Sequence, residues 1–226
     1  FKSSHLQISK SNNLQINPIF KSSNQFIFKS PNQPHLQITK FSNRIIFKLS
    51  HSPYLCPMDI DFQHHLPENF SDDSRVWIYQ SSRLFFISEA LQMESMLTEF
   101  VQNWKSHGTP IKGYANLFFG RFIIFMADES ATGVSGCSTD SSVRLVKEIE
   151  SAFKVDLFDR QSLAFIIKDK IELLPLSQLQ YALDNGFITE DSLYFNNTVL
   201  TKKQLLDNWI IPVKNSWLAR QFTVKH

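Results

Sequence analysis

The stretch DESATGVSGCSTDSSV, residues 128–143, holds the side chains best suited to chemistry in this sequence. Cys137 lies between two carboxylates, among hydroxyl-bearing residues, directly before an amphipathic run. A thiol within one turn of a helix N-terminus is favoured as the thiolate, the form that acts as a nucleophile or redox group. The alternative interpretation is a buried cysteine that packs as a small apolar residue.

An enzyme built on Cys137 needs a base within hydrogen-bond reach of the thiol. The one histidine in the middle of the sequence is His107, in the segment KSHGTP. Either Asp128 or Asp140 is then the carboxylate that orients the base. This hypothesis predicts Cys137, His107 and Asp128 as catalytic residues.

A binding module is the leading hypothesis for the same stretch. Gly133 and Gly136 allow the loop to turn its backbone N–H groups toward an anion. Ser138 and Asp140 are the best candidates for the N-cap of the helix that follows. We therefore expect the 128–142 loop to face a small anionic ligand or a protein partner. The predicted ligand-binding residues are Ser135, Gly136, Ser138, Asp140 and Ser141.

Asp128 and Glu129 end the apolar run FIIFMADE, a shape that also fits a Walker B segment. Nucleotide hydrolysis by that mechanism needs a phosphate-binding loop of the form G-x-x-x-x-G-K-[ST]. None of the six glycines is followed by Lys-Ser or Lys-Thr. Asp128 is therefore also a candidate for capping or bracing a loop.

Residues 1–57 differ in composition from the rest of the chain. They contain no Asp, Glu, Gly, Ala or Val, the five amino acids whose codons begin with G. The segment also repeats itself, because HLQISKSNN at 5–13 returns as HLQITKFSN at 35–43. We interpret it as a non-native leader translated from a G-poor region, with Met58 as the natural start. A genuine basic, low-complexity and disordered tail is the alternative.

The charge balance changes when this segment is set aside. Seven of the 23 basic residues and none of the 21 acidic residues lie in 1–57, so residues 58–226 carry a formal charge of −5. A mildly acidic domain gives no reason to expect a nucleic acid as partner. Two cysteines exclude a disulfide framework and a cysteine-based zinc site, and nothing indicates a cofactor or metal.

The apolar runs are short, the best being FIIFMA at 122–127, so the sequence predicts no membrane insertion. The first segment also lacks the apolar middle of a signal peptide. We therefore expect a soluble cytoplasmic protein.

The first half of the domain is predicted to form the elements that hold the loop. RVWIYQ, at 75–80, alternates like a strand, and the ordered core is expected to begin near Asp73. Ser88 is a plausible N-cap for a helix whose apolar residues recur at helical spacing up to Trp104. Gly108 is predicted to stop this helix in a left-handed conformation.

Two apolar runs follow, at 113–119 and 121–127, and they meet at Gly120. They form either a tight hairpin or one long bent strand. SSVRLVKEIESAF, at 141–153, places its apolar residues on one face of a helix.

The second half repeats this grouping of strands and helices. LAFIIK and KIELLP flank Asp169 and predict a second hairpin. A short helix capped by Ser177, a final strand SLYFNN, and a helix capped by Thr201 that Pro212 ends complete the order. Such grouping predicts an α+β fold, with a mixed or antiparallel sheet and about four helices packed on it. We expect residues 58–226 to form a single domain with an ordered core at about 73–222.

Several segments together resemble a known family. DDSRVWIYQ, HGTPIKG, DESATGVSGCSTDSSVR, DLFDR, YFNN and WIIPVKNSWLARQF occur in this order. They are similar to a family of small bacterial proteins commonly labelled ABC transporter ATPase, and the resemblance runs from about Met58 to Phe222. It implies a bacterial cytosolic setting and, through the label, nucleotide hydrolysis. The sequence contains neither a Walker A loop nor the signature L-S-G-G-Q, so nucleotide hydrolysis ranks third, after ligand binding and cysteine chemistry.

Overall fold

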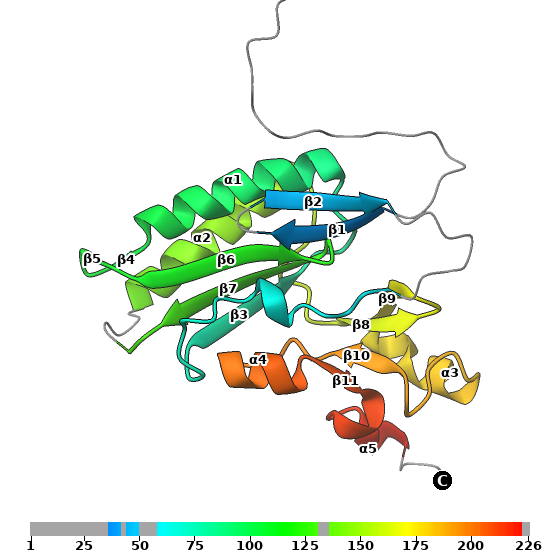
Figure 1. Cartoon of the computed structure of the whole chain (residues 1–226). Coiled ribbons are helices and arrows are strands. Elements are labelled where there is room, and N and C mark those ends of the chain that lie inside the picture. The colour runs from blue at the N-terminus through cyan, green and yellow to red at the C-terminus, as the bar shows by residue number, and fades with distance from the viewer. Residues whose placement is uncertain (1–35, 42–43, 50–57, 131–135, 223–226) are drawn as a thin grey trace, which may run out of the picture.

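The computed structural model describes residues 36–41, 44–49, 58–130 and 136–222, shown in colour in Figure 1. Of residues 36–41, 44–49, 136–138 and 221–222 it describes the backbone alone. Strands β1 (Leu36–Phe41) and β2 (Arg44–Leu49) pair antiparallel. Both lie in the segment interpreted above as a leader, and that interpretation stays a prediction.

The first sheet has three antiparallel strands in the order β3-β7-β6, namely β3 (Arg75–Gln80), β7 (Phe122–Asp128) and β6 (Lys112–Phe118). The predicted strand at 75–80 is confirmed. Of the two alternatives for the following runs, the hairpin is confirmed. Its turn contains Phe119 (φ 51°) and Gly120 (φ 62°), both in the left-handed region.

The second sheet is antiparallel in the order β11-β10-β8-β9. Its strands are β8 (Ser162–Ile167), β9 (Lys170–Pro175), β10 (Leu193–Phe195) and β11 (Ile210–Pro212). The predicted hairpin around Asp169 is confirmed, and its turn residues Lys168 (φ 49°) and Asp169 (φ 59°) are left-handed. The prediction that the strand at 193–195 is the last one was wrong, because the short strand β11 follows it.

Helices α1 (Ile87–Asn103) and α2 (Gly136–Phe153) cover one face of the first sheet (Figure 1). Helix α1 begins one residue before the expected cap Ser88, and Glu89 accepts a hydrogen bond from the Phe86 N–H at 2.7 Å. The prediction that Gly108 stops α1 was wrong. The helix ends at Asn103, and Gly108 (φ 83°) instead lies in the turn between β4 (Lys105–Ser106) and β5 (Thr109–Pro110).

The remaining helices are short and belong to the second half of the chain: α3 (Leu179–Asp184), α4 (Lys202–Asn208) and α5 (Ala219–Phe222). The expected cap of α4 is confirmed, because the Thr201 hydroxyl accepts from the Gln204 N–H at 3.2 Å. Ser177 does not cap α3, because it lies in a 3-10 turn (Leu176–Gln178) that leads into the helix.

The elements stack in four layers, as Figure 1 shows: α1 with α2, the first sheet, the second sheet, and α3 with the C-terminal segment. Strand β7 is the central strand of the first sheet and packs side chains on both of its faces, and every residue of the strand is buried. Phe122, Ile124 and Met126 face the second sheet, whereas Ile123 and Phe125 face the helices, as the period of two in a strand requires. The predicted α+β fold with helices packed on antiparallel sheets is confirmed.

Residues 58–74 are part of this packing. Phe62, Leu66 and Phe70 are buried against the cluster between the two sheets, with a 3-10 turn (Gln63–His65) between the first two. The ring of Phe62 contacts that of Trp209 edge to face at 4.7 Å. Among residues 58–130, packing in the core therefore starts at about Phe62, earlier than the boundary expected near Asp73.

Candidate functional site

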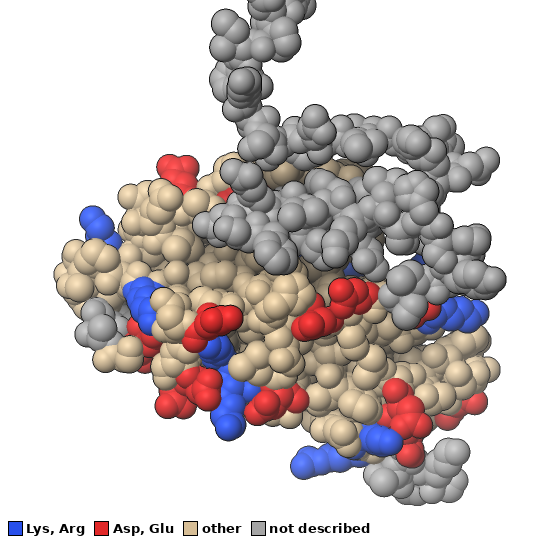
Figure 2. Space-filling view, viewed as in Figure 1, with Lys and Arg blue, Asp and Glu red and all other residues tan. Residues whose placement is uncertain are grey.

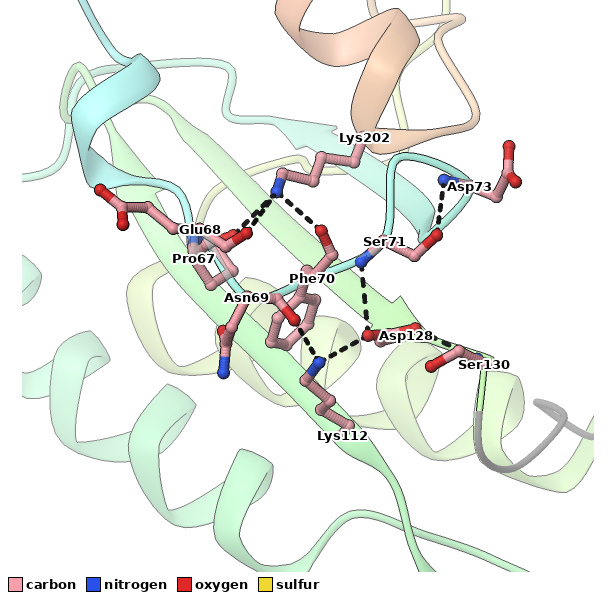
Figure 3. Close-up of polar contacts among 10 residues, drawn as sticks. All are labelled: Pro67, Glu68, Asn69, Phe70, Ser71, Asp73, Lys112, Asp128, Ser130 and Lys202. Carbon is pink, nitrogen blue, oxygen red and sulfur yellow. Dashed lines mark hydrogen bonds and ion pairs between the residues drawn. The ribbon is translucent and has the colours of Figure 1, made fainter.

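Asp128 lies at the end of β7 with 3% of its surface exposed. The hairpin register places Lys112 opposite it, and the ammonium contacts the carboxylate at 2.7 Å (Figure 3). The carboxylate also accepts from the backbone N–H of Ser130 at 3.1 Å and of Ser71 at 3.4 Å. These hydrogen bonds, with that of Lys112 the strongest, hold the pKa of Asp128 well below its usual range.

Two lysines continue this network into the turn at 67–70 (Figure 3). The Lys112 ammonium donates to the Asn69 carbonyl. The Lys202 ammonium, on α4, donates to the carbonyls of Pro67 (2.9 Å), Glu68 (3.3 Å) and Phe70 (2.8 Å). Four consecutive carbonyls thus accept from lysine ammonium groups. Lys202 is buried, with 7% of its surface exposed, so its contacts fasten segment 58–74 to the domain.

Asp128 therefore braces the loop at 69–71, as one of the readings of the sequence expected. The other predicted partner of a catalytic thiol, His107, lies in the β4–β5 turn, where it is exposed and left-handed (φ 48°). The hydrogen-bond donors to Asp128 are Lys112, Ser71 and Ser130. His107 is not among the residues that the structure joins to this carboxylate.

The other predicted site residues lie at the start of α2. Ser135 is outside the described residues, and the side chains of Gly136, Cys137 and Ser138 are outside the description too. Because α2 begins at Gly136, Ser138 and Asp140 lie within the helix, and their prediction as its N-cap was wrong. Cys137 lies in the first turn of the helix, close to the N-terminus as expected, but inside the helix and not in the loop before it.

Ser141, the last of the predicted ligand-binding residues, lines a groove of about 370 Å³ between α1 and α2. Each helix contributes four residues at the spacing i, i+3, i+4, i+7, which is one helical face. The lining is Met96, Glu99, Phe100 and Asn103 from α1 and Ser141, Arg144, Leu145 and Glu148 from α2. Seven of these eight residues were not predicted as site residues.

The groove has an apolar floor and a charged rim. Met96 and Phe100 are half-buried and Leu145 is buried, whereas Arg144, Glu99 and Glu148 are exposed. Arg144 makes no ion pair with any residue that the structure describes. A neighbouring hollow of about 470 Å³ has only polar lining from α1 alone, namely Glu94, Ser95, Thr98, Glu99 and Gln102, so it offers no apolar surface to a ligand.

Metal and membrane sites find no support in the described part of the chain. Among residues 36–41, 44–49, 58–130 and 136–222, no group of three or more His, Cys, Asp or Glu side chains is placed to hold a metal ion. Within the same residues, no helix has both the length and the apolar character that a bilayer crossing requires.

Comparison of this chain with models of known protein families, with curated proteins and with solved structures finds no match. The site is therefore defined by its own geometry.

Proposed function

We propose that this protein is a binding module that takes an amphiphilic anion in the α1–α2 groove. The apolar part of the ligand lies over Met96, Phe100 and Leu145, and its anionic group contacts Arg144. The observation that carries the proposal is an apolar floor beside an arginine that no described carboxylate neutralises. Small-ligand sites typically combine a mainly apolar lining with a few polar groups that fix orientation.

The rim also restricts the charge of the ligand. Glu99 and Glu148 line the same groove as Arg144, so a ligand with several negative charges is repelled by two carboxylates while it is attracted by one guanidinium. A single carboxylate or sulfonate on an apolar chain fits this pattern better than a polyphosphate. The mixture of charges over the face shown in Figure 2 agrees with a partner that is not a polyanion.

Two features favour binding over catalysis. Asp128 is held in an ion pair by Lys112, and His107 is in an exposed turn that the structure does not join to Asp128. Neither residue is thus held in the arrangement that an activated nucleophile requires.

The test is isothermal calorimetry of the full chain with decanoate, and with decyltrimethylammonium as a ligand of equal length and opposite charge. We expect saturable binding of decanoate and weaker binding of the cation. Arg144→Gln should lower the decanoate affinity about 2- to 5-fold, the effect of one exposed charge pair. Lys147→Gln is the matched control, because Lys147 is an exposed cation of the same helix outside the groove lining.

Equal affinity for the two ligands would contradict the anionic part of the proposal. Equal effects of Arg144→Gln and Lys147→Gln would place the binding elsewhere. Met96→Gln should weaken decanoate and leave acetate unchanged, because only the longer ligand reaches the apolar floor.

Cysteine chemistry is the second candidate, favoured by the position of Cys137 in the first turn of an 18-residue helix. The partial positive charge of the helix N-terminus stabilises a thiolate there. Rapid alkylation of Cys137 by iodoacetamide at pH about 6 is the expected result for a reactive thiol. Protection of Cys137 until the protein is denatured would rule this candidate out.

A further inference from the structure

Arg121 lies in a buried corner at the opposite end of β7 from Asp128. Its backbone N–H donates to the Phe118 carbonyl at 2.9 Å, and its carbonyl accepts from the Ser81 N–H at 2.9 Å. The second sheet reaches the same corner, because the side chain of Gln80 donates to the Ser162 carbonyl of β8 at 3.0 Å. The β6–β7 turn accordingly lies beside β8 and β9 (Figure 1). The corner is therefore held from both sheets.

The guanidinium of Arg121 is buried but only partly satisfied. The residue exposes 7% of its surface, and Nη1 donates to the Ser81 carbonyl at 3.1 Å. Nε is buried and has no hydrogen-bond partner, and Nη2 donates to no residue that the structure describes. The edge formed by Nε and Nη2, which can donate two parallel hydrogen bonds to a carboxylate or phosphate, thus has no partner among the described residues.

No described carboxylate neutralises this charge directly. Burial lowers the pKa of Arg121, and the charge of Glu172 on β9 acts against that effect from a distance, without an ion pair within 4 Å. Glu172 is itself exposed. A buried guanidinium without a paired anion is costly, and buried charges in folded proteins are normally paired. An anion bound at this edge would supply the missing partner.

We propose that Arg121 is the centre of a second ligand site, which takes a compact oxyanion, a carboxylate or phosphate group, on its Nε–Nη2 edge. The site is independent of the α1–α2 groove, because no residue of the corner lines that groove. Glu172 opposes the incoming anion by charge repulsion, so it limits the affinity and favours an anion of low charge.

The test is to follow the Arg121 Nε–H resonance by NMR while the full chain is titrated with acetate or inorganic phosphate at constant ionic strength, against sodium chloride. We expect a saturable shift of this resonance with at least one oxyanion and none with chloride. The two arms separate a monoanion site from a phosphate site.

Variants give the site its residue-level check. Arg121→Lys keeps the charge but removes the fork, and should weaken binding about tenfold, the effect of losing one charge-assisted hydrogen bond. Glu172→Gln should strengthen binding several-fold by removing the repulsion. Arg160→Gln is the control and should leave the affinity unchanged. Arg160 is an exposed arginine between α2 and β8.

Two results would overturn the proposal. One is an Arg121 Nε–H resonance that responds to acetate and phosphate no more than to chloride. The other is a shift of that resonance in Glu172→Gln without ligand, together with no oxyanion binding, which would show that Glu172 is the direct partner of Arg121 in solution. Both readouts use the wild-type fold or a surface variant, so they do not depend on how well Arg121→Lys folds.

Discussion

The ion pair between Asp128 and Lys112 makes the sharpest prediction about the stability of the fold. The carboxylate is buried and accepts three hydrogen bonds. Asp128→Asn keeps the shape of the side chain and removes its charge. Hydrogen bonds to a charged group contribute about 1.5–3 kcal/mol, and breaking a buried pair costs about 3–5 kcal/mol. The Lys112 side chain is 40% exposed and regains water, so we expect a loss of about 2–3 kcal/mol at pH 7.

Urea unfolding and thermal melts measure this loss. For a domain of this size about 2–4 °C of melting temperature corresponds to 1 kcal/mol, so the variant should melt about 5–10 °C lower. Glu129→Gln is the matched control at the next residue. Its pair with Arg75, at 3.2 Å, joins side chains that are 35% and 46% exposed, and such pairs contribute about 0–1 kcal/mol.

The pH dependence tests the cause. The pKa of Asp128 is lowered in the folded state, so its contribution to stability is complete above the unfolded-state pKa of about 3.9 and is lost as the pH falls below it. The difference between wild type and Asp128→Asn should therefore shrink between about pH 5 and pH 2. A difference at pH 7 no larger than that of Glu129→Gln, or one that does not change with pH, would refute the assignment of a buried ion pair.

Three further predictions follow from single contacts. Lys202→Met leaves the carbonyls of Pro67, Glu68 and Phe70 without their ammonium donor and should cost about 2–4 kcal/mol. Hydrogen exchange should speed up in segment 58–74 before the rest of the domain, and uniform acceleration would contradict the fastening role. Gly113→Ala places a methyl group 2.6 Å from the ring of Trp104 and should cost about 1–3 kcal/mol of unfolding free energy. The Trp emission spectrum of this variant should shift. Gly108→Ala is the control and should show no such shift, because its added methyl group meets nothing within 4 Å. Burial raises the pKa of Tyr114, so the folded state favours the neutral phenol and loses stability as the pH rises above about 10. Tyr114→Phe should reduce this alkaline loss of stability, measured by urea unfolding. A loss of the same size in the variant would contradict the role of Tyr114.

The sequence contained the information for the Lys112–Asp128 pair, although only Asp128 was singled out from it. Once the two apolar runs form a hairpin centred on Gly120, Lys112 becomes the cross-strand neighbour of Asp128. Alternation and Gly120, which are local properties of the chain, gave that hairpin as one of two alternatives, and the long bent strand was the other. The residues that line the groove could be recognised in the sequence only as one face of each of two separate helices. Their proximity could not be predicted, because the sheet that brings α1 and α2 together depends on long-range contacts.

Three features of the fold differ from their prediction for physical reasons. Phe62, Leu66 and Phe70 occur at a spacing of four, but charged and amide residues surround them, so the ordered core was expected to begin only near Asp73. Gly108 does adopt the left-handed conformation that was expected, but in a hairpin turn instead of a helix end. Strand β11 has three residues, too few for alternation to be visible.

The turn between β8 and β9 shows that this chain has not reached the most stable sequence for its own backbone. Lys168 and Asp169 both hold left-handed conformations, which Asn-Gly adopts with less strain in two-residue hairpins. Exchanging the pair for Asn-Gly should raise the free energy of unfolding of the domain by about 0.5–1 kcal/mol for each residue whose backbone strain is relieved. Substitutions in this turn should therefore give a more stable variant without changing either proposed ligand site.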